Sequence, residues 1–393
     1  DTANATYTTM VKNIMHEQPD FIVFCGDICT RKFNKDRAIQ LAEAFEKMGV
    51  YWSGVLGNHE GDEATMSRQE MVDMWSKYNH CLIDPTVKHA SDGTPVWGVG
   101  NHVINILGSN NKVAQSFFFL ESGKIMDNQM VDIYKDEISW MKNVGKISQD
   151  TTEYYDYIKD SQINWYKETF LKIKSTSPNA TSTVFSHNPI KDMEDAYIAF
   201  MNDQYSSVPS KQGVGVLENI WPFTPAKSYV DIASSNDGMI LGRRREDMCY
   251  SPRDAYYAKD QNSHTPIFNA LKNYGGAHPA FFCGHDHLND FVLKKEGVTL
   301  GYIEPATYST YNMFTKGLLG NDPYSVGEIP TGDNLIEGYS SLKYDLNSNK
   351  NMIVEMKHYT NFDLYKGEHN NEITKYIDNL KGPYESKSHI YIN

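Results

Sequence analysis

Apolar residues follow two different spacings along this chain. Ile39, Ala42, Phe45 and Met48 recur every three or four positions, which is the period of an amphipathic helix, and Gly49 marks its end. Elsewhere the apolar residues form short continuous runs, rich in β-branched and aromatic side chains, as in buried strands. Alternation of these two patterns is typical of βαβ units with a parallel sheet, so we expect an α/β fold.

Similar patterns predict the remaining elements. Helical spacing predicts a helix over residues 36–48 and others at 8–18, 66–77, 137–144 and 162–173. Pro19 follows the first of these helices and ends it, because proline cannot continue a helix. The apolar runs predict strands at 21–25, 51–56, 96–107, 115–120, 183–186 and 281–283, one strand within 297–312, and paired strands within 335–360.

Four of the predicted strands end in residues that can bind metal ions. In an open α/β sheet, ligands bind beyond the carboxyl ends of the strands. Residues two apart in an extended segment, such as His285 and His287, point to the same side. Mixed oxygen and nitrogen donors suit Zn, Mn or Fe better than Ca. The residues offered by the four strand ends are Asp27, Asn58, His59, His187, His285 and His287.

The order and spacing of these motifs resemble the calcineurin-like metallophosphoesterase family. The motifs are Gly26-Asp27, Gly57-Asn58-His59-Glu60, His187 and Gly284-His285-Asp286-His287. Residues 284–291, 19–24 and 162–165 are similar to a purple-acid-phosphatase-like subgroup of plants and fungi. The resemblance covers most of residues 7–312. It implies a four-layer α/β/β/α sandwich, with two mixed sheets flanked by helices, and a dinuclear centre that hydrolyses phosphate esters.

The resemblance also implies a role for each candidate ligand. Asp27 is the candidate bridge between two metals, because a carboxylate can bind two cations. Asn58, His187 and His285 resemble ligands of the second metal, and His287 resembles a ligand of the first. Each also has a structural interpretation: the Asp and the Asn can be turn residues, and the histidines can be hydrogen-bonded core residues.

His59 has a different expected position. It follows Asn58 directly, so its side chain should point away from the ligands and towards the substrate. The matching histidine of the family acts as a general acid or stabilises the transition state, and the near-neutral intrinsic pKa of histidine suits protonation of an alkoxide leaving group. Glu60 and Asp62 are candidates to orient it, although a plain acidic turn explains Asp62 better. Asp290 is a candidate to hold a ligand histidine by a hydrogen bond from outside the metal site.

Two features depart from the family pattern. Purple acid phosphatases carry a metal-binding Tyr three residues after the bridging Asp, where this chain has Thr30. We therefore expect no charge-transfer colour, and Zn, Mn or Fe(II) rather than an obligatory ferric ion. The family's opening motif, a strand that ends in Asp-x-His, is not found before Asp27. Because the chain begins with Asp1, we expect that motif upstream in a longer or processed protein; the alternative is a depleted site.

We expect residues 1–360 to form the catalytic domain. Residues 191–280 have weaker periodicity, and the family resemblance implies that this span is a loop-rich insertion around the mouth of the site. Within it, Arg243 is a candidate to bind the substrate phosphate, although a solvated surface run also explains it and its two arginine neighbours. Tyr308 is a second candidate on the substrate side. Residues 361–393 are polar and predict a C-terminal extension.

Composition narrows the range of partners. The 393 residues are 40% hydrophobic and 22% charged, as in ordinary globular proteins, and the net charge of −13 argues against a nucleic-acid partner. No apolar run approaches the length of a transmembrane helix. The sequons Asn4-Ala5-Thr6 and Asn179-Ala180-Thr181 permit N-glycosylation. We expect a secreted, vacuolar or lysosomal protein, with a cytoplasmic location as the alternative.

Five cysteines are too few for a disulfide scaffold. Cys25 and Cys283 lie in predicted core strands and should be buried thiols. Cys29, Cys81 and Cys249 can include one disulfide, whose pairing the sequence leaves open.

The predicted activity is hydrolysis of small phosphorylated substrates, above all phosphomonoesters, by a metal-activated water. Phosphodiesters, including sphingomyelin-like or nucleotide substrates, are the alternative substrate class. A relative that keeps the fold but only binds a phosphorylated ligand or a partner is the alternative outside enzymes.

Overall fold

The largest sheet has seven strands in the order β3-β4-β5-β8-β10-β9-β7. The structure is a computed structural model that describes residues 2–28, 34–62, 65–204, 228–230, 235–242, 244, 246–260, 263–306, 338–346 and 352–360. The sheet is mixed, because β4, β5, β8 and β10 are parallel while β3, β9 and β7 join its edges antiparallel. The strands are β3 His102–Leu107, β4 Val113–Phe119, β5 Thr181–Phe185, β7 Gly238–Leu241, β8 Ala280–Cys283, β9 Val292–Lys295 and β10 Val298–Tyr302.

The other described strands form two smaller sheets. Strands β1 (Phe21–Cys25) and β2 (Tyr51–Val55) pair in parallel. Strands β11 (Gly338–Asp345) and β12 (Met352–Thr360) pair antiparallel, which confirms the paired strands predicted within 335–360, and β6 (Ser228–Val230) adds to β12.

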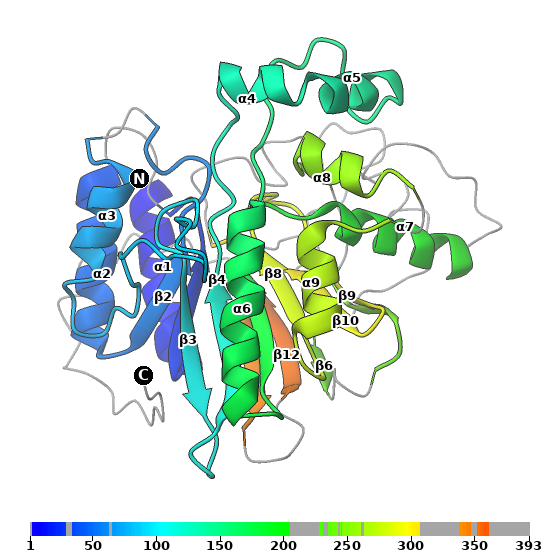
Figure 1. Cartoon of the computed structure of the whole chain (residues 1–393). Coiled ribbons are helices and arrows are strands. Elements are labelled where there is room, and N and C mark those ends of the chain that lie inside the picture. Colours follow the sequence, from blue (N-terminus) through cyan, green and yellow to red (C-terminus); the bar gives the residue numbers. More distant parts are fainter. Residues whose placement is uncertain are drawn as a thin grey trace, which may run out of the picture.

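Three apolar cores arrange these sheets and the helices in four layers (Figure 1). The first core packs α1 (Thr2–Glu17), α2 (Asn34–Met48) and α3 (Arg68–Trp75) on β1 and β2. The second lies between the sheets and joins Phe117, Phe185 and Phe282 to Cys25 and Met356. The third packs α6 (Asp160–Thr176), α7 (Lys191–Gln204), α8 (Pro252–Tyr257) and α9 (Pro266–Tyr274) on the other face of the large sheet. This α/β/β/α arrangement is the one predicted.

Helices α4 (Asn128–Ile133) and α5 (Lys135–Asn143) lie beyond one end of the large sheet (Figure 1), and α5 packs on α8 through Trp140 and Met141. They belong to a long connection between β4 and α6, and this connection has a small apolar core of its own, made by Met126, Ile138, Tyr154 and Tyr157.

One predicted strand differs from the structure. The strand expected from residue 96 begins only at His102, because Gly98 and Gly100 adopt φ values of 96° and 75° and break the extended backbone. The described part of 191–280 contains α7, α8 and α9. Thr265 and Ser251 cap two of these helices with their side chains, a short-range signal that periodicity does not register.

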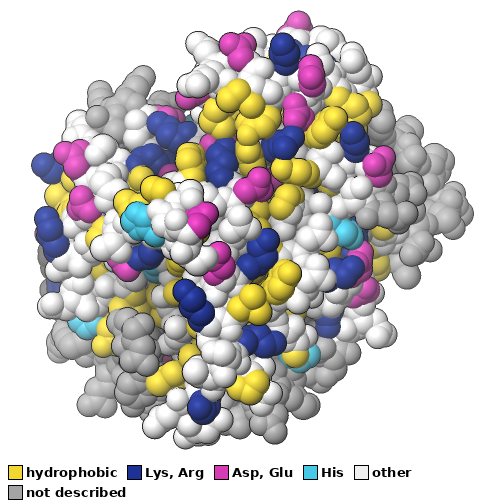
Figure 2. Space-filling view, in the orientation of Figure 1, with side chains coloured by type: hydrophobic (Ala, Val, Ile, Leu, Met, Phe, Trp, Pro, Cys, Tyr) yellow, Lys and Arg dark blue, Asp and Glu magenta, His cyan; other side chains and the backbone are white. Residues whose placement is uncertain are grey.

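The described cysteines, Cys25, Cys81, Cys249 and Cys283, are all free thiols. Cys25 and Cys283 are buried, as predicted, whereas Cys29 lies outside the described residues. No helix in the described part of the chain has the length and apolar character needed to cross a bilayer. Basic and acidic side chains are mixed over the face that Figure 2 shows.

Candidate metal centre

Four side chains meet beyond the carboxyl ends of β1, β2, β5 and β8. The Nε2 atom of His187 lies 2.8 Å from Oδ1 of Asn58 and 3.1 Å from Oδ2 of Asp27. The same atom lies 3.1 Å from Nδ1 of His285. Each residue follows its strand by two or three positions, so the parallel ends of the strands bring them together.

This donor set fits a transition-metal ion. Donor atoms of Asp27, His187 and His285 all lie within 4.8 Å of one another. Nitrogen and oxygen ligands bind such ions at about 2.0–2.2 Å, which places neighbouring donors roughly 3 Å apart. The spacing around His187 already matches that value, and neutral imidazole, carboxylate and amide oxygen suit Zn, Mn or Fe.

Unusual backbone conformations aim these side chains. Asp27 and His285 have positive φ values of 56° and 75°, which are uncommon for residues other than glycine. Gly26, at φ 89°, cannot carry a side chain, since an added Cβ would lie 2.5 Å from Nδ1 of His187. Strain at these junctions is typical of functional sites.

A set of outer hydrogen bonds fixes the ligands. Nδ1 of His187 donates to the carbonyl of Cys25 at 2.5 Å, which leaves Nε2 free to bind a metal. The buried carboxylate of Glu60 accepts from the backbone N–H groups of Asp27, at 2.9 Å, and of Gly57, at 2.5 Å. Glu60 therefore joins the β1 and β2 loops.

Arg68 supports the same loops from α3. Its NH1 group donates to the carbonyls of Gly57, at 2.6 Å, and Glu60, at 2.8 Å. Its other nitrogens bind the carboxylate of Glu121, whose side chain is 4% exposed. The guanidinium is thus fully engaged in holding the metal loops in place.

Electrostatics couples the three ionisable ligands. Burial would raise the pKa of Asp27, but the charge and hydrogen bond of His187 lower it below its usual value. Burial opposes charge on His187 as well, yet Asp27 outweighs it and raises the pKa of His187. Burial and the neighbouring His187 hold the pKa of His285 well below its usual value. His285 is therefore neutral, the form that binds metals.

His59 lies beside the ligands and faces outwards. Its backbone N–H donates to Oδ1 of Asp27 at 2.8 Å, while its side chain is 51% exposed. Nδ1 lies 2.6 Å from Oδ2 of Asp62, so Asp62 orients the ring and is more than the acidic turn we expected. The second oxygen of Asp62 lies 3.4 Å from Nζ of Lys124.

The comparison with known families agrees with this geometry. A sequence model of the calcineurin-like phosphoesterase family matches residues 3–300. The chain belongs to this family. Its fold is thus that of a calcineurin-like phosphoesterase.

Similar curated proteins come from Arabidopsis thaliana. Probable inactive purple acid phosphatase 28 is 28% identical over 76% of this chain and 61% of its own length. Probable inactive purple acid phosphatase 14 is 25% identical over 78% and 63%. The chain thus spans about three fifths of the length of these relatives. A solved dimetal phosphatase from Danio rerio matches with a TM-score of 0.42 and 11% identity, over 78% of this chain and 79% of that one.

The remaining predicted residues are placed less fully. His287 is half-buried, and its charge lowers the pKa of His285. It does not belong to the group of donor atoms formed by Asp27, His187 and His285. The backbone carbonyl of Asp290 accepts a hydrogen bond from His358, and its predicted hold on a ligand histidine stays a prediction. Arg243 and Tyr308 lie outside the described residues.

Sequence reasoning missed three residues next to the ligands. The ring of Tyr155 meets that of His285 edge to face, with centroids 4.4 Å apart. Cys249 and Asp286 form a second group of possible donors with His285. The backbone N–H of Cys249 and the hydroxyl of Tyr302 both donate to Asp286, so this carboxylate also ties neighbouring segments together. Asp286 lies within the motif of residues 284–287 that follows β8, whereas Tyr155 and Cys249 follow no strand in a recognisable motif.

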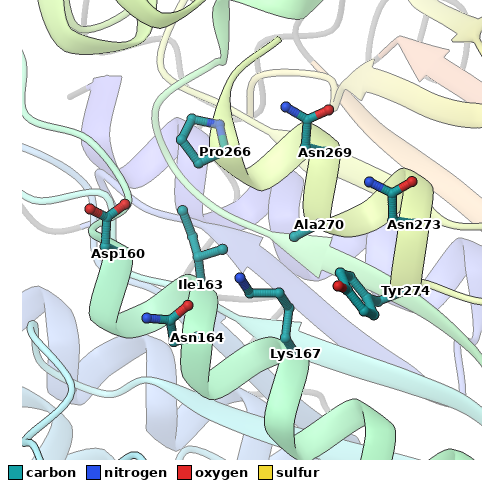
Figure 3. Close-up of a pocket in the computed structure, with 9 residues that line it drawn as sticks. All are labelled: Asp160, Ile163, Asn164, Lys167, Pro266, Asn269, Ala270, Asn273 and Tyr274. Atoms are coloured by element: carbon teal, nitrogen blue, oxygen red, sulfur yellow. The ribbon is translucent and has the colours of Figure 1, made fainter.

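A separate pocket of about 370 Å³ lies between α6 and α9 (Figure 3). It is lined by Asp160, Ile163, Asn164, Lys167, Pro266, Asn269, Ala270, Asn273 and Tyr274. These helices cover the outer face of the large sheet, and none of the lining residues belongs to the metal centre.

Proposed function

We propose that this calcineurin-like phosphoesterase hydrolyses phosphomonoesters with bound transition metals. The convergence of Asp27, Asn58, His187 and His285 on one point carries the proposal. A pair of metals in such a site neutralises phosphoryl oxygens and activates a water molecule. Asp27 would bridge the two ions, and His287 would serve the first of them.

The chain's own residues hold the reactants. Glu60 and Arg68 fix the two loops that carry Asp27 and Asn58, and so would hold these two residues in place as ligands. His59 stands at the exposed side, with its Nδ1 bound to Asp62. Its Nε2 atom would donate the proton that the leaving alkoxide needs.

A non-catalytic phosphate-binding protein is the second candidate. The observation in its favour is that the donor group contains Asp27, His187 and His285 but not His287. The two Arabidopsis relatives carry the word inactive in their names, and that word describes those proteins alone. A site with one metal would bind a phosphorylated ligand without a second ion to activate water.

Metal reconstitution separates these candidates. The protein is stripped with a chelator, reloaded with Zn, Mn or Fe(II), and assayed with p-nitrophenyl phosphate and with bis(p-nitrophenyl) phosphate. Metal-dependent turnover of the monoester supports the proposal. Turnover of the diester alone indicates a phosphodiesterase. Metal binding with no turnover of either ester overturns the enzymatic proposal and leaves phosphate binding.

A further inference from the structure

The connection between β4 and α6 reaches the metal centre at two points. Its two ends run side by side, because the carbonyl of Lys124 accepts from Asp156 N–H at 2.8 Å and Ile125 bridges to Tyr155. Tyr155 contacts the ring of His285 on one side. Lys124 is therefore held on a segment that already touches a metal ligand.

The ammonium group of Lys124 lies at the exposed side of the site. It is 3.4 Å from Oδ1 of Asp62, whose other oxygen is bound to His59. A Cβ added to Gly61 would lie 3.5 Å from the same nitrogen. The side chains of Lys124, Asp62 and His59 are 38%, 36% and 51% exposed, so a ligand beside His59 can reach the ammonium.

A simple surface ion pair is the competing explanation. Exposed pairs of this kind contribute about 0–1 kcal/mol, and a separation of 3.4 Å is long for a strong hydrogen bond. Asp62 therefore holds Lys124 only weakly. The nearby cation Arg68 is different, because its side chain is 13% exposed and its guanidinium donates to Glu121 and to two loop carbonyls.

We propose that Lys124 binds the substrate phosphate and selects phosphomonoesters over phosphodiesters. This inference rests on the proposed function. At neutral pH a phosphomonoester carries close to two negative charges, since its second pKa is about 6, whereas a diester carries one. A lysine beside the reacting group acts as a point charge towards phosphate oxygens. It therefore favours the dianion.

The test compares Lys124→Gln, Lys124→Arg and a control, Lys135→Gln, in the metal-loaded protein. Lys135 is exposed on α5 of the same connection. Because a hydrogen bond to a charged group contributes about 1.5–3 kcal/mol, kcat/KM for p-nitrophenyl phosphate should fall about 10- to 100-fold in Lys124→Gln, mainly through KM. The diester should change less than about 3-fold, and Lys124→Arg should keep most of the activity.

Equal losses for both esters would overturn the inference, because a displaced His59 lowers kcat for either substrate alike. An unchanged Lys124→Gln variant would overturn it too. If the wild-type protein turns over neither ester, the proposed function fails, and binding of inorganic phosphate decides the role of Lys124. Phosphate binding that is weaker in Lys124→Gln but not in Lys124→Arg or Lys135→Gln would support that role. Equal phosphate affinity in all variants would exclude it.

Discussion

His187 and His285 are 98 residues apart in the chain, yet Nε2 of the first lies 3.1 Å from Nδ1 of the second. Their rings meet at 74°, with centroids 4.9 Å apart. Strands β5 and β8 are parallel neighbours, so both histidines leave the sheet at the same edge. Two nitrogens that face one point at this distance are arranged to share a cation.

Removal of one of these nitrogens should empty the site. We expect His285→Ala to lower metal affinity at least 100-fold, because changes to mere supporting partners of metal ligands already cost about 10- to 100-fold. Phosphatase activity should fall with the metal content. Elemental analysis of protein dialysed against limiting metal measures the first quantity, and p-nitrophenyl phosphate turnover measures the second.

His89→Ala is the matched control. His89 is exposed and lies outside the metal centre, so its loss should change neither metal content nor activity. An unaltered metal content in His285→Ala, with the fold intact by circular dichroism, would refute the assignment of His285 as a ligand.

The local parts of this site could be predicted from sequence. A short apolar run followed by a polar residue, with a glycine between them in three of the four cases, is a contiguous signal, and it located Asp27, Asn58, His187 and His285 at strand ends. The four-layer fold followed from the family resemblance that the same motifs carry. Long-range partners were not predictable: Lys124 follows Asp62 in the sequence only after α3, β3 and β4, and no spacing rule links the two residues.

Glu60 shows the same limit at short range. The sequence makes Glu60 a candidate support for His59, and in the structure its carboxylate accepts from the backbone N–H groups of Gly57 and Asp27. Choosing between these partners requires the path of the loop after β2, which depends on Arg68 and on the parallel register of β1 and β2. The spacing of residues in the sequence specifies neither the path of this loop nor the register of the two strands.

Gly57 should tolerate no side chain. An added Cβ would lie 2.2 Å from Oδ1 of Asp27 and 2.5 Å from its backbone nitrogen. The φ angle of Gly57 is outside the left-handed region, so the effect of Gly57→Ala is steric. We expect Asp27 to be displaced, metal binding to be lost, and stability to fall by about 1–3 kcal/mol, measured by urea unfolding and elemental analysis.

Gly108→Ala provides a comparison of the same kind. Its Cβ would lie 2.8 Å from the carbonyl of Leu346, away from the metal centre. The variant should lose stability and keep its metal. If Gly57→Ala also kept its metal, Asp27 would not be a ligand in the position described.

Arg68→Met should destabilise the protein strongly. Glu121 would keep a buried carboxylate without its cation, and loss of one partner of a buried pair costs about 3–5 kcal/mol. Two loop carbonyls would also lose their donors. Arg68→Lys should recover part of the loss, because it keeps the charge but not the planar fork. Urea unfolding measures both effects.

Lys88→Met tests whether any ion pair would show the same effect. Lys88 pairs with Asp84, whose side chain is 47% exposed. Such a pair contributes about 0–1 kcal/mol, so its loss should be small. A loss in Arg68→Met no larger than this would mean that Arg68 does not support the loops.

Glu194 should make stability depend on pH under acidic conditions. Its carboxylate is 9% exposed, lies 3.3 Å from Nζ of Lys191 and 3.1 Å from Nζ of Lys146, and accepts from the hydroxyl of Tyr250 at 2.7 Å. Burial would raise the pKa of Glu194, but Lys191, Arg244 and Lys146 lower it to about 2. Its ordinary value is 4.5, and the difference corresponds to about 3 kcal/mol.

Because the folded pKa is lowered, this contribution is complete above about pH 4.5 and is lost as the pH falls towards 2. Urea unfolding of Glu194→Gln at pH 7, 4.5 and 3 should show a large deficit at pH 7 that narrows as the pH falls. Asp247→Asn removes an 82% exposed partner of the same Arg244, and its effect should stay within about 1 kcal/mol at every pH. A deficit in Glu194→Gln that does not change with pH would mean that lost side-chain contacts, and not the charge of Glu194, account for it.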